Sequence, residues 1–462
     1  MTSNSDGINK KLVFIIAAVA ATGGLLFGFD TGVISGALLF LKKDFGLDPH
    51  AQEWVVSAVL LGCITGAIAS GKMVDALGRR KAIIGTACIF AAGSAWTSLA
   101  GTIPELIAGR IVIGLAIGVA SYAVPLYISE ISPPQYRGAL VSLNQLLITI
   151  GIVASYLVDD AFAGTSQTWR YMFIAGVIPA VILGTGMLFL PETPCWLAGK
   201  GREDKALGII NKLMPGSDAD KELSSIRQAS SQDDSGSMKQ LSAPWLRPAL
   251  FIGVGIMFIQ QATGINTVIY YAPTIFEMAG FTSATTAITA TVGVGLVNVA
   301  MTIVAIRLVD KLGRKPLLSA GLIGMTISLA TLALGFQFQA EIGAELKWVT
   351  VVVLFVYIGS FAVSLGPIAW LLIAEIYPLH VRGLAMSLAT LSNWVFNFII
   401  SFTFLSLVET LGKAGAFWLY AGIGVVGWFF CRFFVPETKG VALETIESNL
   451  RNKVHPRDLG QS

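Results

Sequence analysis

The sequence predicts an all-α membrane protein with twelve transmembrane helices arranged as two similar sets of six. Of its 462 residues, 54% are hydrophobic and only 13% are charged, whereas a typical soluble protein carries about 25% charged residues. The mean hydropathy is +0.73. Apolar stretches of about 20 residues, the length that crosses a bilayer, recur along the whole chain, and short motifs recur in the same order in both halves.

Twelve apolar stretches are long enough to cross a membrane as helices. Between the sixth and the seventh lies a polar segment rich in Ser and Asp, which predicts short amphipathic helices and a flexible connector. The predicted spans are Leu12–Leu39, Glu53–Met73, Ala82–Ala100, Pro104–Ile128, Ala139–Val158, Tyr171–Leu190, Pro248–Phe276, Ala284–Val309, Leu317–Phe338, Trp348–Ala374, Leu384–Val408 and Ala416–Val435.

The distribution of basic residues predicts that both termini are cytoplasmic. In that orientation 25 of the 31 Lys and Arg residues lie in cytoplasmic segments, as the positive-inside rule requires. No cleavable signal peptide is evident, because the first apolar run continues past Phe40 without a small-residue cleavage site. We expect an N-terminal six-helix bundle over residues 1–198, a cytoplasmic linker over 199–247, a C-terminal six-helix bundle over 248–440 and a cytoplasmic tail over 441–462.

Repeated motifs indicate that the chain is a duplicated six-helix unit. Two motif pairs recur 245 positions apart and a third recurs 235 positions apart. Such a duplication relates the halves by an axis along the membrane normal and predicts a ligand site between them near the midplane. The pairs are SEISPPQYRG (Ser129–Gly138) with AEIYPLHVRG (Ala374–Gly383), PET at Pro191 with PET at Pro436, and VDALGRRK (Val74–Lys81) with VDKLGRKP (Val309–Pro316).

The seventh span carries the most informative polar residues. Its segment Phe251–Phe276 is apolar enough for a bilayer, yet it contains Gln260, Gln261 and Asn266. An amide without a partner is costly at membrane depth, so these side chains face water, a ligand or another helix. Amides both donate and accept hydrogen bonds, which suits a neutral ligand rich in hydroxyl groups. The alternative is hydrogen bonding between packed helices.

Paired charged loops predict a cytoplasmic gate. Asp75, Arg79 and Arg80 lie in a short loop between two spans, where Gly78 permits a tight turn. The arginines can reach carboxylates such as Glu130 and Glu192, and the network would hold the two halves together when the site faces outside. The simpler interpretation is a positive-inside signal alone. The positive-inside signal alone would require neither Asp75 nor a second copy of this loop motif at residues 310–315.

A carboxylate in the first span predicts a proton site. Asp30 lies among apolar residues and glycines, where a charge is costly. Arg110 is the basic residue in the membrane portion of the N-terminal half. A pair of this kind that exchanges its proton with outside water could couple transport to protons. The alternatives are a static structural pair and a carboxylate at the outer rim.

Further amides and tryptophans lie in other spans. Sugars suit such residues, because their hydroxyls bond to amides and their C–H faces stack on indole. Each tryptophan taken alone is more simply explained as an interface anchor or a core residue. The residues are Asn144 and Gln145 in span 5, Asn298 in span 8, Trp370 in span 10, and Asn393, Trp394 and Asn397 in span 11.

Several function classes are disfavoured. The four cysteines and three histidines are scattered and form no metal set, and we expect neither a metal nor a cofactor. A net charge of +3 is small and indicates no nucleic-acid partner. Ser and Thr residues lack a base partner in any recognisable motif, so we expect no enzyme activity.

These motifs together resemble the sugar porters of the major facilitator superfamily, and in particular the bacterial proton symporters for galactose, arabinose and xylose. The resemblance extends over all twelve spans. Its most specific motif is QQ-x-x-G-I-N, whereas the loop motifs are shared across the superfamily. The matching segments are GRIVIG from Gly109, PLYISEISPPQYRG from Pro125, NQLLITIG from Asn144, PETPCWL from Pro191, QQATGIN from Gln260, VDKLGRK from Val309, GPIAWLLIAEIYP from Gly366 and VPETKG from Val435.

The resemblance implies the major facilitator fold and a role for each matching residue. Asp30 matches the proton-coupling carboxylate and Arg110 its partner. The positions that match sugar-binding residues are Gln145, Gln260, Gln261, Asn266, Asn298, Trp370, Asn393 and Trp394. The cytoplasmic gate comprises Asp75, Arg79, Glu130, Arg137, Glu192, Asp310, Arg314, Glu375, Arg382 and Glu437.

One position departs from the family pattern. Cys195 stands where that pattern, P-E-[ST]-P-R-W-L, has an arginine. One donor to the inner gate is therefore missing, which would weaken the outward-facing state unless Lys200 or Arg202 substitutes for it.

The sequence thus predicts a proton-coupled importer of a hexose or pentose that works by alternating access in a plasma membrane. The absence of any N-x-[ST] sequon favours a bacterial inner membrane. We expect the chain to be monomeric, with a monosaccharide, a proton and the lipid bilayer as its partners. A passive uniporter is the main alternative, although an uncharged residue is expected at position 30 in passive members. A transporter-like sugar sensor and a drug exporter fit less well, because the tail is short and the predicted site is polar.

Overall fold

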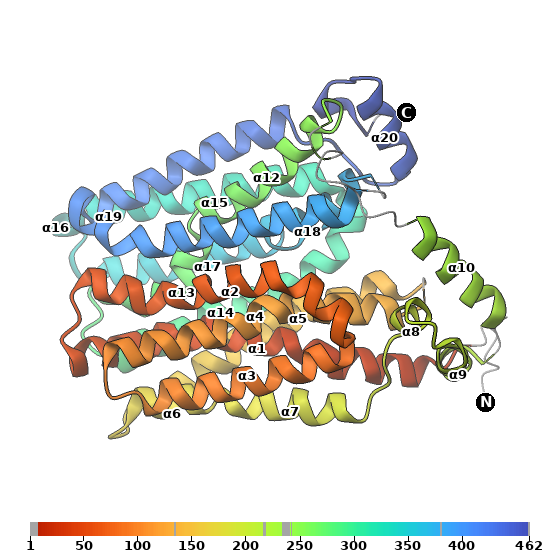
Figure 1. Cartoon of the computed structure of the whole chain (residues 1–462). Coiled ribbons are helices and arrows are strands. Elements are labelled where there is room, and N and C mark those ends of the chain that lie inside the picture. The colour runs from red at the N-terminus through yellow and green to blue at the C-terminus, as the bar shows by residue number, and fades with distance from the viewer. Residues whose placement is uncertain are drawn as a thin grey trace, which may run out of the picture. The chain divides into compact units, whose positions relative to one another are not determined.

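The computed structural model describes residues 8–133, 135–215, 219–232, 241, 243–378 and 381–460. Within these ranges every regular element is a helix (Figure 1). The elements up to the central linker are α1 (Lys10–Phe45), α2 (Pro49–Leu77), α3 (Arg79–Leu99), α4 (Ile103–Ile131), α5 (Arg137–Phe162), α6 (Thr168–Ile174), α7 (Val177–Leu188), α8 (Pro194–Gly199), α9 (Glu203–Leu213) and α10 (Ala219–Gln232).

The second part of the chain repeats the pattern of long apolar helices, and some of its spans are divided into shorter elements. Its elements are α12 (Arg247–Ala262), α13 (Ile265–Met278), α14 (Ala284–Leu312), α15 (Arg314–Gln337), α16 (Gln339–Ile342), η1 (Gly343–Glu345), α17 (Leu346–Ala362), α18 (Leu365–Ile376), α19 (Arg382–Phe433), α20 (Leu443–Arg451) and η3 (Pro456–Asp458).

The predicted membrane spans are confirmed. Among the described residues, eleven helical segments are long and apolar enough to cross a bilayer. The last of them, α19, has 52 residues and includes Gly412, whose backbone (φ 73°, ψ 164°) is not helical. This interruption separates the predicted spans Leu384–Val408 and Ala416–Val435. The twelve predicted spans therefore correspond to eleven helical segments, of which one contains two spans.

The chain forms two compact units. The first comprises the described residues of Met1–Phe29, Leu61–Gly151 and Phe173–Asp234. The second comprises those of Asp30–Leu60, Ile152–Met172 and Ser235–Ser462. The boundary between the units falls within α1, α2, α5 and α6, so it differs from the domain boundaries expected from the sequence, which remain a prediction.

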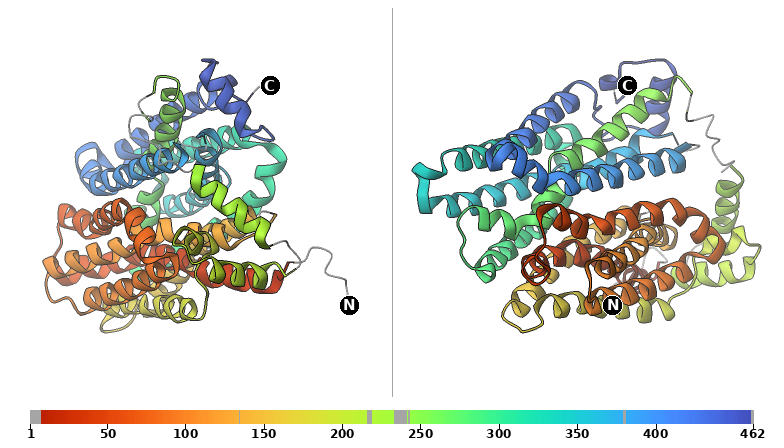
Figure 2. Two further views of the ribbon diagram at one scale, coloured as in Figure 1. Left: turned by 45° about the vertical axis from the view of Figure 1, so that its right-hand side comes forward. Right: turned by 60° about the vertical axis from the view of Figure 1, so that its left-hand side comes forward.

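In the first unit, α3 packs along α4 and α7. The helix α4 begins with a complete N-terminal cap: the Thr102 hydroxyl accepts a hydrogen bond from the Glu105 amide at 3.4 Å, and a proline occupies the first turn. The linker helices α8, α9 and α10 pack on one another (Figure 2). Their contact buries a small core of Leu197, Ala206, Ile210 and Leu223. The expected short helices of the linker are thus present.

In the second unit, α19 packs along α15 and α12, and α17 packs on α15 and α14. The short tail helix α20 lies beside the end of α18. The Arg451 guanidinium of α20 stands 4.3 Å from the centre of the Trp245 ring, a cation–π contact. This packing surrounds the interrupted seventh span, which carries the amide residues of the candidate site.

Candidate functional site

The interruption of the seventh span positions its three amides. The helix α12 ends directly after Gln260 and Gln261, and α13 begins directly before Asn266. Gly264 joins the two helices with a left-handed backbone (φ 86°, ψ 20°), a conformation that glycine adopts without steric cost. The freed carbonyl of Thr263 accepts a hydrogen bond from the Tyr357 hydroxyl of α17 at 2.8 Å. The seventh span is therefore interrupted at Gly264, between Gln261 and Asn266.

Four of the predicted site residues form one hydrogen-bonded cluster, which we call the amide cluster: Gln260, Gln261, Asn266 and Asn393. The Asn393 amide nitrogen donates to Gln260 Oε1 at 2.6 Å. Gln261 Nε2 donates to Asn393 Oδ1 at 3.2 Å and to Gln260 Oε1 at 3.3 Å. Asn266 Nδ2 donates to Gln261 Oε1 at 2.7 Å. The amides therefore contribute to the contact between α12, α13 and α19.

A hydrogen bond anchors the amide cluster to α18, and the Asn266 side chain at the edge of the cluster can still bind a ligand. Gln260 Nε2 donates to the Leu365 carbonyl at 2.8 Å, which fixes this side chain against the start of α18. Asn266 is only partly buried, and its Oδ1 accepts no hydrogen bond from the described residues. The cluster can therefore accept a ligand hydroxyl at its open edge, and the internal bonds hold the amides in fixed orientations.

The other predicted sugar residues lie on four helices. In the second unit, Asn298 of α14 and Trp394 of α19 are buried, whereas Trp370 of α18 is half-buried. Gln145 is half-buried on the part of α5 that belongs to the first unit. The structure thus brings four of the eight residues into direct contact with one another, and the sugar-binding roles of all eight remain predictions.

The predicted proton-coupling residues are both buried. Asp30 of α1 is 3% exposed, and Arg110 of α4 is fully buried. The Arg110 guanidinium lies 5.9 Å from the centre of the Phe173 ring, within the range of a cation–π contact. The two residues belong to different units, so their pairing remains a prediction.

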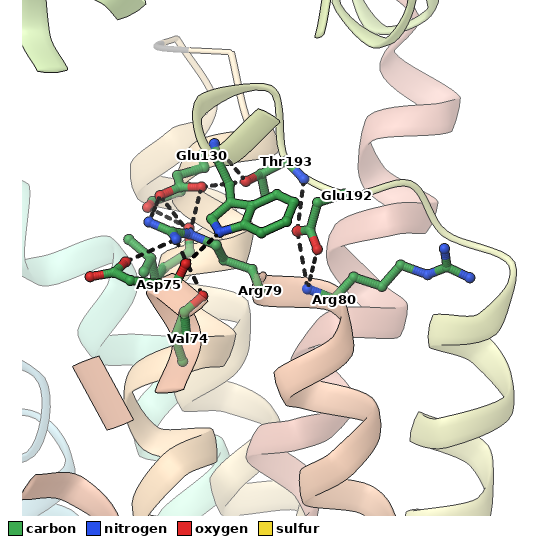
Figure 3. A network of polar contacts seen from close by, with 10 residues as sticks. Val74, Asp75, Arg79, Arg80, Glu130, Glu192 and Thr193 are labelled. Atoms are coloured by element: carbon green, nitrogen blue, oxygen red, sulfur yellow. Dashed lines mark hydrogen bonds and ion pairs between the residues drawn. The ribbon is translucent and has the colours of Figure 1, made fainter. Parts of the chain in front are cut away.

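The predicted gate residues of the first unit form a charge network, shown in Figure 3. Arg79 Nε contacts both carboxylate oxygens of Glu130 at 3.1 Å, and its Nη2 donates to Glu130 Oε1 at 3.0 Å. The Thr193 hydroxyl donates to Glu130 Oε2 at 2.5 Å. The Arg80 amide donates to Glu192 at 3.1 Å. The start of α3 is thereby tied to the end of α4 and to the segment before α8.

The second unit contains the same network at the repeated positions. Arg314 Nη2 donates to Glu375 Oε1 at 2.7 Å, the Thr438 hydroxyl donates to Glu375 Oε2 at 2.5 Å, and the Arg314 amide donates to Glu437 Oε1 at 3.0 Å. Gly78 and Gly313 precede the two arginines with the same positive φ of 93°. A side chain at Gly78 would collide with Glu192, which accepts from the Arg80 amide, and a side chain at Gly313 would collide with Glu437, which accepts from the Lys315 amide. The sequence repeat therefore encodes one local structure twice.

Comparison with known proteins identifies the family. Residues 16–450 match the model of the family described as Sugar (and other) transporter. The chain belongs to that family. It is 47% identical over 433 residues to the putative metabolite transport protein YwtG of Bacillus subtilis (strain 168), covering 94% of each chain. It is 42% identical over 453 residues to the galactose-proton symporter of Escherichia coli (strain K12), covering 98% of this chain and 97% of the symporter.

A solved structure of this family has the same fold. The partially occluded inward-open xylose transporter XylE from E. coli superimposes with a TM-score of 0.82 at 33% identity, covering 94% of this chain and all of that one. The predicted major facilitator fold, the multi-pass membrane location and the assignment to transporters, not enzymes, are thereby confirmed.

Two residues expected at the gate of this sugar transporter, Arg137 and Arg382, lie outside the charge networks, and the side chain of a third, Asp310, is not described. Arg137 is exposed at the start of α5 and forms no side-chain ion pair with the described residues. Arg382 Nε donates to the Tyr377 carbonyl at 3.2 Å, and Arg382 contacts no carboxylate of the described chain. The side chain of Asp310 lies outside the described residues. Asp75 does join its network, because Arg79 Nη1 donates to Asp75 Oδ1 at 3.0 Å.

The position that departs from the sugar transporter pattern lies beside the first charge network. Cys195 is half-buried near the start of α8. Burial, together with the negative charge of Glu130, raises the pKa of the Cys195 thiol to about 12. The Arg79 and Arg137 side chains act in the opposite direction on this pKa. An arginine at position 195 would face the same carboxylate, which agrees with the donor role inferred from the family pattern.

Two buried carboxylates, Glu53 and Asp159, were not predicted from the sequence as candidate functional residues. Glu53 of α2 is fully buried and accepts hydrogen bonds from the Ser406 amide and hydroxyl, both at 2.7 Å. Asp159 of α5 is also fully buried. Both lie at the ends of predicted spans, where carboxylates are common, so their burial was not expected. The pair Asp159-Asp160 next to an apolar run was the available signal. Among the described residues, no group of acidic, His or Cys side chains could hold a metal.

Proposed function

We propose that this chain imports a monosaccharide together with a proton by alternating access in a bacterial inner membrane. The single observation that carries the proposal is the amide cluster of Gln260, Gln261, Asn266 and Asn393, which joins three helices at an interrupted membrane span. Neutral donors and acceptors in fixed orientations suit sugar hydroxyls. Membership of the sugar transporter family supports the same substrate class.

Proton coupling is the second part of the proposal. Asp30 is buried in a membrane helix, where ionised carboxyl groups are costly and are commonly functional. In the proposed cycle Asp30 binds a proton from outside, the sugar binds, and the site then opens to the cytoplasm. Release of the proton, assisted by the positive charge of Arg110, resets the carrier. The relatives named as proton symporters for galactose and arabinose support this cycle.

The charge networks would form the cytoplasmic gate. Each network ties a short loop between two spans to a following carboxylate, and the distribution of Lys and Arg residues favours a cytoplasmic position for these loops. In this proposal both termini are cytoplasmic, the networks stabilise the outward-facing state, and the protein functions as a monomer.

The test is uptake of labelled glucose, galactose, xylose and arabinose into proteoliposomes, with and without an inward proton gradient. We expect accumulation of at least one sugar above its equilibrium level, and collapse of this accumulation on addition of a protonophore. Asp30→Asn should lose accumulation and keep sugar exchange. Equilibration without accumulation in the wild type would instead identify a passive uniporter, and the absence of any flux would refute sugar transport by this chain.

A further inference from the structure

The described helices contain a buried acid with little stabilisation of its charge. Asp159 of α5 is fully buried. Its Oδ2 accepts a hydrogen bond from the Gly36 amide of α1 at 3.2 Å, and its Oδ1 has no hydrogen-bond partner among the described residues. Gly36 lies inside α1, so its amide also bonds along the helix and is shared between two acceptors. One shared donor is weak compensation for a buried negative charge.

Close packing of α1 on α5 creates this environment. Gly32 and Gly36 lie one helical turn apart on α1 and face Ser155 and Asp159, which lie one turn apart on α5. A Cβ atom at Gly36 would lie 2.5 Å from Asp159 Oδ2 and 2.6 Å from Asp159 Cγ. Small residues at this spacing permit close helix packing in membranes. Water is therefore excluded from Asp159 while α1 and α5 are in contact.

Among the described residues, no positively charged group contacts Asp159. On α5, Tyr156 lies one turn earlier and donates its hydroxyl to the Ile269 carbonyl at 3.1 Å, and Asp160 Oδ1 accepts from Thr289 at 2.6 Å. On α13, Tyr270 is buried close to Tyr156. On α1, Asp30 precedes Gly36 by six residues and the exposed Lys42 follows it by six, each about 9 Å along the helix. The stretch of α14 that contains Thr289 carries no titratable side chain before Arg307.

We infer that Asp159 is a second proton-binding carboxyl of the transport cycle, distinct from Asp30. This inference rests on the proposed function and on the predicted orientation, in which the ends of α1 and α5 that contain Gly36 and Asp159 face outside. When this end is hydrated, outside water supplies a proton to Asp159 Oδ1. The neutral acid keeps Oδ2 as the acceptor for Gly36, and α1 packs on α5. The proton returns to outside water when the helices separate.

In this cycle the outer side closes only when Asp159 is protonated. Asp30, in contrast, carries the proton that crosses the membrane. The two roles predict different behaviour when Asp30 is replaced. Sugar exchange by Asp30→Asn no longer depends on proton translocation, yet each turnover still closes and opens the outer side. A dependence of exchange on outside pH should therefore remain in Asp30→Asn and originate from Asp159.

The experiment measures sugar exchange in right-side-out vesicles at fixed internal pH and varied external pH. We expect exchange by Asp30→Asn to fall several-fold as the external pH becomes alkaline. The double variant Asp30→Asn/Asp159→Asn should exchange at a rate that is independent of external pH. The matched control Asp30→Asn/Asp160→Asn alters the adjacent, half-buried carboxylate and should keep the fall.

A second measurement does not require transport. Infrared spectra of the purified protein at neutral pH should show the carbonyl band of a protonated carboxylic acid, which Asp159→Asn removes and Asp159→Glu shifts. The inference is overturned if exchange by Asp30→Asn is independent of external pH, if the double variant with Asp159→Asn keeps the fall, or if the band is unchanged by Asp159→Asn. A complete absence of sugar exchange in all variants and the wild type would overturn the proposed function itself.

Discussion

The side chain of Gln261 contacts the three other residues of the amide cluster, and its removal should affect both stability and sugar binding. Gln261→Ala removes the bonds to Gln260 and Asn393 and leaves Asn266 Nδ2 without its acceptor. A neutral hydrogen bond contributes about 1 kcal/mol, and about 1.4 kcal/mol corresponds to a tenfold change in affinity. We expect the sugar concentration for half-maximal exchange to rise about tenfold.

A matched control for this prediction is Gln52→Ala. Gln52 of α2 is likewise buried, at 3% exposure, but its amide donates to the Leu47 carbonyl just before α2, at 3.0 Å, and not to a residue of the amide cluster. Its replacement should lower the thermal stability and leave the concentration dependence of exchange unchanged. Equal effects of the two variants on that concentration dependence would argue against a sugar site at the amide cluster.

The Cys195 thiol should react slowly with maleimides at neutral pH. Its pKa is raised to about 12 by burial and by Glu130, and the thiolate is the reactive form. In a variant that keeps Cys195 as its single cysteine, the alkylation rate should rise about tenfold per pH unit between pH 8 and pH 10, because the thiol remains mostly protonated there. An ordinary cysteine reaches its plateau near pH 9.

The control for Cys195 is Glu130→Gln. This change removes a negative charge that raises the thiol pKa, so alkylation at pH 8 should become faster. A plateau near pH 9 in the single-cysteine protein would show that Cys195 is more exposed than the structure indicates.

At the scale of elements, Arg79 holds the start of α3 to the end of α4. The Arg79 and Glu130 side chains are each only 12% exposed, and breaking a buried ion pair costs roughly 3 kcal/mol because one charge stays without its partner. Arg79→Ala should therefore lower the apparent Tm in detergent. Arg79→Lys should recover only part of this loss, since an ammonium group cannot make the same bidentate contact.

The control for Arg79 is Arg227→Ala. Arg227 pairs with Glu203 on the exposed linker helices, where both side chains are more than one third exposed. Such exposed pairs contribute little to stability, so the apparent Tm should not change. A loss as large as that of Arg79→Ala would show that the linker, not the charge network, limits stability.

The junction between α12 and α13 depends on Gly264. An alanine there would occupy the left-handed region at a cost of about 1–2 kcal/mol, and its Cβ would lie 3.3 Å from the Tyr420 ring. Gly264→Ala should therefore lower stability and weaken sugar binding together, because Gln261 and Asn266 flank the junction. In Gly422→Ala the added Cβ meets no atom within 4 Å, so this variant should behave as the wild type.

At the scale of the whole molecule, the apolar stretches and repeated motifs predicted the fold correctly. Spans of about 20 apolar residues have few structures available in a bilayer other than helices, so the spans followed from composition. The repeated loops likewise predicted that Arg79 and Arg314 form equivalent networks. The sequence did not show that Gly412 is the one non-helical residue within α19.

The candidate site could be predicted only in part. Amides within the seventh span were recognisable because polar groups are rare at membrane depth. The family resemblance assigned Asn393 to the same sugar site, but it did not predict the hydrogen bonds between Asn393 and these amides. Asp159 and Glu53 were missed, because their burial depends on helices distant in the sequence: Gly36 approaches Asp159, and Ser406 bonds Glu53. When the ends of spans are predicted from hydropathy alone, carboxylates at those ends are expected to lie in water.

Proton coupling is the central claim for the whole molecule. Its most direct test measures the pH of a weakly buffered external medium while sugar is added to energy-depleted cells or vesicles that contain the protein. Proton-coupled import predicts an immediate alkalinisation with each transported sugar, no response to sugars that are not transported, and no response in Asp30→Asn. Sugar uptake by the wild type without any change in external pH would contradict proton coupling and identify the protein as a passive carrier.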